Sequence, residues 1–163
     1  YTTNGNEVRS ASGKPGPKYW QNRADYKLTA NLNETDKTIN GSVELSYTNN
    51  SPDDLEFIWM YLDQNLFAKD SRGNAVVPVS GSRNGAKGEE FNGGHKVSNL
   101  NVDGKAAKYE ITDTRMKIML DKPLKANGGK IKVEMNFSFI SPEYGSDRMG
   151  YLPTKNGTIY TIA

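Results

Sequence analysis

Apolar and polar positions alternate with a period of two over long parts of this chain, which predicts β-strands with one face on a core and one face in water. The first alternating stretch covers residues 26–33 and the second covers residues 39–47, with the polar stretch Glu34–Lys37 between them. Together they predict a β-hairpin. Gly41 falls on the inward register, where a missing side chain predicts a bulge or close packing of a neighbour. The residues expected on the core face are Tyr26, Leu28, Ala30, Leu32, Ile39, Val43, Leu45 and Tyr47.

The next strand, Leu55–Leu62, is apolar on both faces. Its sequence LEFIWMYL places Phe57, Trp59 and Tyr61 on one side, and Ile58, Met60 and Leu62 on the other. A strand of an antiparallel sheet normally keeps one polar face. The pattern therefore favours a strand in the middle of a sandwich core, and the alternative is an outer face covered by another domain.

The remaining pattern is also that of an all-β protein. Residues 63–96 are rich in glycine and predict a long loop, preceded at most by one helical turn. Alternation returns at residues 97–102, and the Asp103-Gly104 pair then predicts a tight hairpin turn. No stretch of helical length keeps a 3.6-residue period. We expect an all-β, antiparallel sandwich of about seven to nine strands with one long glycine-rich loop. The later strands are expected around residues 109–111, 116–120 and 131–139.

Composition narrows the class of protein further. The 163 residues fit one domain, and a net charge of +2, with basic residues scattered singly, gives no indication of nucleic-acid binding. The chain has no cysteine, which excludes disulfides and thiolate metal sites, and no apolar run has the length of a membrane span. Residues 1–18 are polar and read as a flexible leader or spacer, so residues 19–163 form the expected domain. The first residue is Tyr1 and not Met, as expected of a mature or excised chain.

Candidate catalytic residues are few. His95 is the only histidine, and it lies in the glycine-rich loop with no second imidazole to share a metal. The carboxylate pairs Asp53-Asp54 and Glu89-Glu90 lie in polar stretches, where solvated side chains are the better interpretation. Trp59 and its aromatic neighbours would form a stacking platform for carbohydrate only if they were exposed, and core packing is the expected alternative.

The stretch YWQNRADYKLTANLNETDKTINGSVELSYTNNSPDDLEFIWMYLDQNLF, Tyr19–Phe67, resembles the start of bacterial zinc aminopeptidases related to aminopeptidase N, peptidase family M one. In that family the N-terminal domain is a saddle-like, all-β assembly. It includes a VDGK turn like Val102–Lys105 and a closing strand like Lys130–Ile140. The resemblance covers most of residues 19–163.

The resemblance also implies that the chemistry lies elsewhere. The family binds its catalytic zinc through an H-E-x-x-H motif, and a single histidine cannot provide that motif. We therefore expect this domain alone to contain no zinc and no activity, and to be the non-catalytic part of a zinc aminopeptidase that removes N-terminal residues from peptides. Its implied partners are a catalytic domain of the same polypeptide and peptide substrates, with no nucleic acid and no membrane span.

The last residues, GTIYTIA, resemble the family segment that enters the substrate cleft. The resemblance implies that Tyr160, Thr161, Ile162 and Ala163 lie closest to the substrate, and that the domain as a whole helps to anchor the substrate's amine end. A hydrophobic patch or a self-association contact is expected near this strand. The polar leader and the family's habit indicate a periplasmic or secreted protein. The alternatives are a free-standing β-sandwich that binds glycan or protein, and a structural spacer domain.

Overall fold

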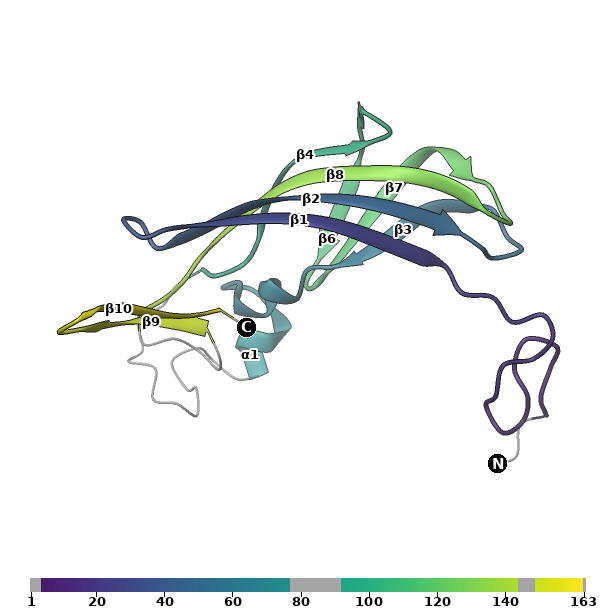
Figure 1. Ribbon diagram of the computed structural model, residues 1–163, viewed down its shortest axis with the longest axis horizontal. Helices are drawn as coiled ribbons and strands as arrows, with labels where there is room; N and C mark the ends of the chain where they lie inside the picture. The colour runs from purple at the N-terminus through teal and green to yellow at the C-terminus, as the bar shows by residue number, and fades with distance from the viewer. Residues whose placement is uncertain (1–3, 77–91, 144–148, 163) are drawn as a thin grey trace.

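The computed structural model describes residues 4–76, 92–143 and 149–162, and it is an all-β protein (Figure 1). Ten strands and two short helices lie in the described residues. The strands are β1 (Arg23–Asn33), β2 (Thr38–Asn49), β3 (Leu55–Tyr61), β4 (Lys96–Val102), β5 (Lys105–Ala106), β6 (Tyr109–Thr112), β7 (Arg115–Leu124), β8 (Gly129–Ile140), β9 (Met149–Thr154) and β10 (Gly157–Ile162). The helices are the 3-10 helix η1 (Asp63–Phe67) and α1 (Arg72–Val76).

The strands form a five-stranded sheet of order β1-β2-β8-β4-β5, a three-stranded sheet of order β3-β7-β6 and the separate hairpin β9-β10. Every pair of neighbouring strands is antiparallel. The all-β sandwich predicted from the sequence is thus confirmed. The strand number exceeds the expected seven to nine because β5 is only two residues long and no strand was predicted at Met149–Thr154, where β9 lies.

The hairpin turns lie where the sequence predicts them. Asp103 and Gly104 both have positive φ angles, of 49° and 77°, as the turn between β4 and β5 requires. Asn127 and Gly128 have φ angles of 55° and 108° just before β8. Asp113 has a φ angle of 56° between β6 and β7. Asp and Asn adopt this left-handed conformation more readily than other side chains, so local sequence determines these reversals.

The main core lies between the two sheets. It contains buried residues from β2, β8 and β4 of the large sheet and from β3 and β7 of the small one. A second, smaller cluster of Ile39, Phe139 and Met149 joins one end of the large sheet to β9. The main cluster consists of Val43, Leu45, Ile58, Leu62, Leu100, Met116, Ile118, Val133 and Met135.

The face of β1 that was predicted to be buried in the core is largely exposed. Tyr26 pairs with Leu45 and Leu28 with Val43, so both lie on the face that carries the core. Each is nevertheless 63% exposed. The main core cluster contains no residue of β1 because the three-stranded sheet covers only the middle of the five-stranded sheet. The alternation correctly identified the face, but the opposing layer does not reach β1.

The doubly apolar strand β3 also departs from the core interpretation. Ile58 and Leu62 are buried, whereas Phe57, Trp59 and Tyr61 on the other face are exposed, and Trp59 keeps 55% of its surface accessible. The outer face of the small sheet is therefore not the interior of the sandwich. In the part of the chain that the structure describes, no second layer covers it.

Of the two roles predicted for Gly41, a bulge or close packing of a neighbour, the structure confirms close packing. The β1-β2 and β2-β8 pairings run through Gly41 without a register shift, so there is no bulge at this position. A Cβ atom at Gly41 would overlap the Phe137 ring and the carbonyl oxygen of Thr29. Glycine is required here because β2 passes close to both neighbouring strands.

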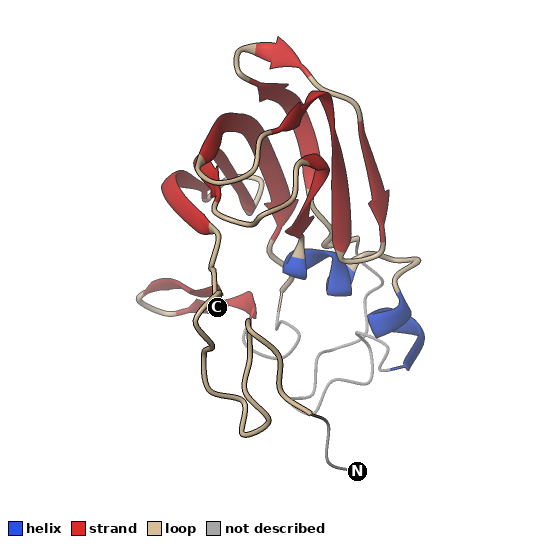
Figure 2. Cartoon of the chain, turned by 90° about the vertical axis from the view of Figure 1, so that its right-hand side faces the viewer, coloured by secondary structure: helices blue, strands red, loops and turns tan. Residues whose placement is uncertain are grey.

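The described segments outside the sheets contain turns and two short helices. Residues 7–18 form turns with an isolated bridge between Arg9 and Pro15. The helical turn expected after β3 is present as η1, and α1 follows it; both lie at one end of the strands (Figure 2). Most of the predicted glycine-rich loop lies outside the described residues. Neither helix in the described ranges is long and apolar enough to cross a membrane.

Candidate functional site

The β9-β10 hairpin carries the residues that the sequence placed next to a substrate. Tyr160 pairs with Tyr151 and Ile159 with Leu152 across the hairpin, so the two tyrosines share one face and the two aliphatic side chains share the other. Tyr160 is half-buried, whereas Thr161 and Ile162 are exposed. Ala163 lies outside the described residues. The hairpin therefore has one face turned toward the domain and one turned away from it.

Lys37 holds the tyrosine face. Its Nζ donates a hydrogen bond to the Tyr160 hydroxyl at 2.9 Å and another to the Glu34 carbonyl oxygen at 2.6 Å. The same ammonium lies 5.1 Å from the ring centroid of Tyr151 and 5.5 Å from that of Tyr160, within the range of cation-π attraction. The hydrogen bond to Tyr160 is the main reason that the pKa of Lys37 is raised. We call Lys37, Tyr151 and Tyr160 the lysine clamp.

The clamp joins parts of the chain that are far apart in sequence. Lys37 lies in the turn between β1 and β2, with a φ angle of 60°, and its carbonyl oxygen accepts a 2.8 Å hydrogen bond from the Ser141 N–H. Met149, the first residue of β9, is buried, and its Sδ accepts a hydrogen bond from the side chain of Gln64 in η1 at 3.0 Å. The hairpin is thus attached to the large sheet and to η1 as well.

Of the three clamp residues, only Tyr160 was named from the sequence, as a residue expected next to a substrate; Lys37 and Tyr151 were missed. A lone lysine in a polar turn carries no signal in the sequence, because its partner lies 123 residues further along the chain. Tyr151 also approaches Glu143, whose Oε2 is 3.5 Å from the tyrosine hydroxyl. Desolvation is the main reason that the pKa of Tyr151 is raised.

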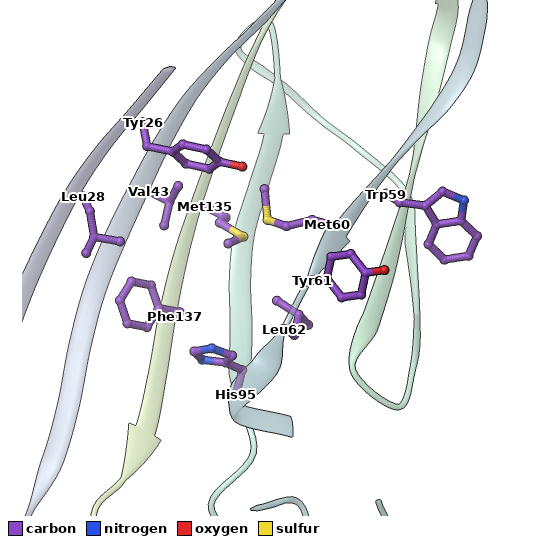
Figure 3. Close-up of a pocket in the computed structure, with 10 residues that line it drawn as sticks. All are labelled: Tyr26, Leu28, Val43, Trp59, Met60, Tyr61, Leu62, His95, Met135 and Phe137. Carbon is purple, nitrogen blue, oxygen red and sulfur yellow. The ribbon is translucent and has the colours of Figure 1, made fainter. Parts of the chain in front are cut away.

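An open apolar groove of about 340 Å³ separates β1 from β3 (Figure 3). It exists because the small sheet leaves the β1 side of the large sheet uncovered. Figure 3 shows Tyr26 and Leu28 on one side and Met60 and Leu62 on the other. The full lining consists of Tyr26, Leu28, Val43, Trp59, Met60, Tyr61, Leu62, His95, Met135 and Phe137.

His95 lies at one end of this groove. Its ring packs edge-on against Phe137 and Phe139, with centroid distances of 5.5 Å and 5.3 Å. Its Nδ1 is buried without a hydrogen-bond partner among the described residues. Desolvation lowers the pKa of His95, and the charge of Asp63 opposes that shift only in part. The imidazole behaves as a packing residue, and in the described part of the chain it belongs to no group of three or more His, Cys, Asp or Glu side chains that could hold a metal ion.

Two basic side chains lie over the exposed aromatic face of β3. Lys117 Nζ lies 4.3 Å from the Phe57 ring centroid, and the Arg115 guanidinium lies 5.9 Å from that of Tyr61. Phe57 and Trp59 meet edge to face, with an interplanar angle of 82°. This surface is amphipathic, but adjacent rings do not form one flat platform.

The carboxylate pair that the structure describes, Asp53-Asp54, provides no catalytic geometry. Asp54 forms an ion pair with Lys125 at 2.7 Å and accepts a hydrogen bond from the Ala126 N–H, and these contacts lower its pKa. The neighbouring Asp53 uses its backbone carbonyl oxygen to accept a hydrogen bond from Asn49. Glu89 and Glu90 lie outside the described residues. Among the residues that the structure describes, no group of three or more His, Cys, Asp or Glu side chains could hold a metal ion.

A scan against protein-family models and a search of curated proteins found no match. Among solved structures, the chain is similar to zinc metallopeptidases of family M one from Deinococcus radiodurans. A mutant with a bound Tyr-Ser-Ala substrate matches with 15% identity and a TM-score of 0.45, over 73% of this chain and 20% of that chain. Another structure of the mutant matches with 14% identity and the same TM-score, over 81% of this chain and 25% of that chain. The chain spans a fifth to a quarter of the length of these structures.

Proposed function

We propose that this chain is the non-catalytic N-terminal β domain of a zinc aminopeptidase that removes N-terminal residues from peptides. The sequence resemblance of Tyr19–Phe67 to that family supports the proposal, and so does the all-β fold that the resemblance implies. The observation that carries it is the outer face of the β9-β10 hairpin. Leu152 and Ile159, which face away from the lysine clamp, are 43% and 58% exposed. An exposed apolar pair on an anchored hairpin suits a surface against which a second domain packs.

In this proposal the domain walls one side of the substrate cleft. The lysine clamp would fix Tyr160, and the residues that follow it, Thr161, Ile162 and Ala163, would border the site of the substrate's amine end. The exposed aromatic face of β3 would lie against the catalytic domain, which accounts for its apolar character. We also propose a periplasmic or secreted location for the enzyme.

The proposed enzyme needs zinc to polarise the peptide carbonyl and to activate water. The described residues of this chain do not form a site for it, since they offer a single imidazole that is engaged with two phenylalanine rings. The metal would therefore be held by the catalytic domain. The role left to this chain is to bind and orient the substrate.

The test uses the complete reading frame that contains this sequence. An H-E-x-x-H motif in that frame, stoichiometric zinc and hydrolysis of aminoacyl-p-nitroanilides that is lost on chelation are the expected results. In that enzyme, Tyr160→Ala should raise KM more than it lowers kcat, because it acts on binding of the substrate. Lys155→Ala, in the exposed turn of the same hairpin, should change neither. A frame without the motif, or a purified zinc-loaded protein without aminopeptidase activity, would overturn the proposal.

A free-standing glycan-binding module is the second candidate, and the exposure of Trp59 favours it. The perpendicular arrangement of Phe57 and Trp59 weakens it, because stacked sugar rings need parallel aromatic faces. Glycan-array binding that is lost in Trp59→Ala and retained in Tyr109→Ala would support this module. A lack of signal for the unmodified chain would exclude it.

A further inference from the structure

Among the strands that the structure describes, none pairs with the outer edge of β1. β1 is the end strand of the five-stranded sheet, and all eleven of its residues pair with β2. Within the described ranges, the backbone of β1 makes no hydrogen bond to any other strand. A long, regular edge strand of this kind presents free N–H and C=O groups to a further strand, unless bulges, proline or short length prevent it. β1 is eleven residues long and has no proline and no bulge in its pairing with β2. Its charged side chains, Arg23, Asp25 and Lys27, are of both signs and can therefore pair with a second strand.

The side chains of β1 favour pairing as well. Tyr26 and Leu28 are apolar and exposed, and they lie on the face of the sheet that carries the core. On the opposite face, Arg23, Asp25 and Lys27 alternate in charge along the strand. An added strand would therefore gain apolar contacts on one face and ion pairs on the other.

The charge order of β1 is complementary to itself. If two copies pair in antiparallel fashion about a two-fold axis at Tyr26, Asp25 of each copy lies opposite Lys27 of the other. The same register places Tyr26 against Tyr26, and Leu28 against Ala24. Moving the axis to Asp25 or to Lys27 sets two like charges against each other, and moving it to Leu28 brings no opposite charges together. Opposite charges in direct cross-strand positions stabilise a pairing, and like charges destabilise it.

Contacts already present in one copy would extend this arrangement. Arg23 forms an ion pair with Asp25 at 2.8 Å, and Lys27 forms one with Glu44 at 3.1 Å. Across the axis, Arg23 and Asp25 of one copy would be followed by Lys27 and Glu44 of the second copy. The charges of these four side chains would then alternate between positive and negative. Lys27 is well exposed in the single chain, so it is accessible to a second carboxylate.

We propose that this protein forms a two-fold symmetric dimer by antiparallel pairing of its β1 strands about Tyr26, which extends the large sheet across both copies. The pairing satisfies the free backbone edge and packs Tyr26 and Leu28 against the second copy. It also closes the β1 side of the apolar groove. The interface is isologous, as in most homodimers. The proposal depends on β1 alone and not on the proposed enzymatic function.

The first test measures molar mass by light scattering during gel filtration, from micromolar to millimolar concentration. The mass should rise with concentration from 18.0 kDa toward twice that value. Asp25→Lys and Lys27→Asp should each raise the dimer dissociation constant about tenfold, because each places like charges together twice across the axis. The double variant Asp25→Lys/Lys27→Asp restores opposite charges across the axis and should recover part of the dimerisation, because the Arg23–Asp25 and Lys27–Glu44 ion pairs within each copy are still lost. Asn31→Lys, on the same strand but without a facing charge, should leave it unchanged.

The second test uses the absence of cysteine from the chain. Tyr26→Cys places two thiols opposite each other at the axis and should give a covalent dimer under mild oxidation. Ala30→Cys, on the same face of β1 but away from the axis, should not. Circular dichroism melts confirm that each variant is folded. A monomer at every concentration, a dimer insensitive to both charge reversals, or equal cross-linking at both cysteine positions would overturn the proposal.

Discussion

Replacing Asn49 by aspartate should strongly destabilise the fold. Asn49 lies at the end of β2 and is fully buried. Its Nδ2 donates to the carbonyl oxygens of Asp53 at 2.8 Å, Lys125 at 3.1 Å and Leu124 at 3.3 Å. Its Oδ1 accepts from the Ser51 hydroxyl at 2.6 Å. One side chain thus joins β2, the segment that leads into β3, and the turn between β7 and β8.

The size of the effect follows from these contacts. Asn49→Asp keeps the shape but removes both N–H donors, and it places a negative charge against three carbonyl oxygens away from water. Each of the three lost hydrogen bonds costs about 1 kcal/mol, and the carbonyl oxygens left unsatisfied in the buried site add to this cost, so we expect a loss of at least about 3 kcal/mol. That is a large share of the roughly 5–15 kcal/mol that stabilise a typical domain.

Urea unfolding followed by tryptophan fluorescence measures the loss. The matched control is Asn40→Asp on the same strand, whose side chain is exposed and makes no hydrogen bond to the described residues. A surface change of this kind stays within about 0.5 kcal/mol. Burial raises the pKa of the new carboxyl group above the unfolded value of about 3.9, so the folded state holds the proton more tightly. The loss of unfolding free energy caused by Asn49→Asp should therefore be smallest at acidic pH and increase as the pH rises. Equal stability of the two variants at neutral pH would refute this role of Asn49.

Two further predictions concern the interior. Burial lowers the pKa of His95, so below the unfolded pKa of about 6.5 the folded state binds fewer protons than the unfolded chain. The contribution of His95 to the free energy of unfolding should therefore be greatest above that pH and decrease as the pH falls below it. His95→Phe should flatten that slope in urea midpoints measured at several pH values, and an unchanged slope would contradict it. Gly41→Ala should lose about 1–3 kcal/mol in thermal or urea unfolding, because its Cβ overlaps Phe137 and the Thr29 carbonyl oxygen. Ser42→Ala is the neighbouring control, and equal stability of the two would mean that β2 can shift to make room.

Much of the fold was predictable because strands and turns depend on the order of neighbouring residues in the sequence. Period-two alternation located most of the strands, and the Asp103-Gly104 pair, which favours the left-handed conformation, located the turn between β4 and β5. Gly41 marked a close approach of neighbours for the same reason, since only a missing side chain fits there. In the candidate site, Tyr160 could be named only through the family resemblance. Lys37 could not be named, because its contact with Tyr160 exists only when the two ends of the sheet fold together.

The sequence by itself thus determined which residues form strands, where the chain turns and which side chains share a face of a sheet. Only the tertiary structure decided which of those faces is buried. Tyr26 and Ile58 belong to equally clear apolar faces, yet Tyr26 is exposed and Ile58 is core. The physical reason is that alternation specifies two sides of a strand, whereas burial depends on how far the opposing layer extends. Three strands facing five leave β1 uncovered, and that width is set by long-range pairing.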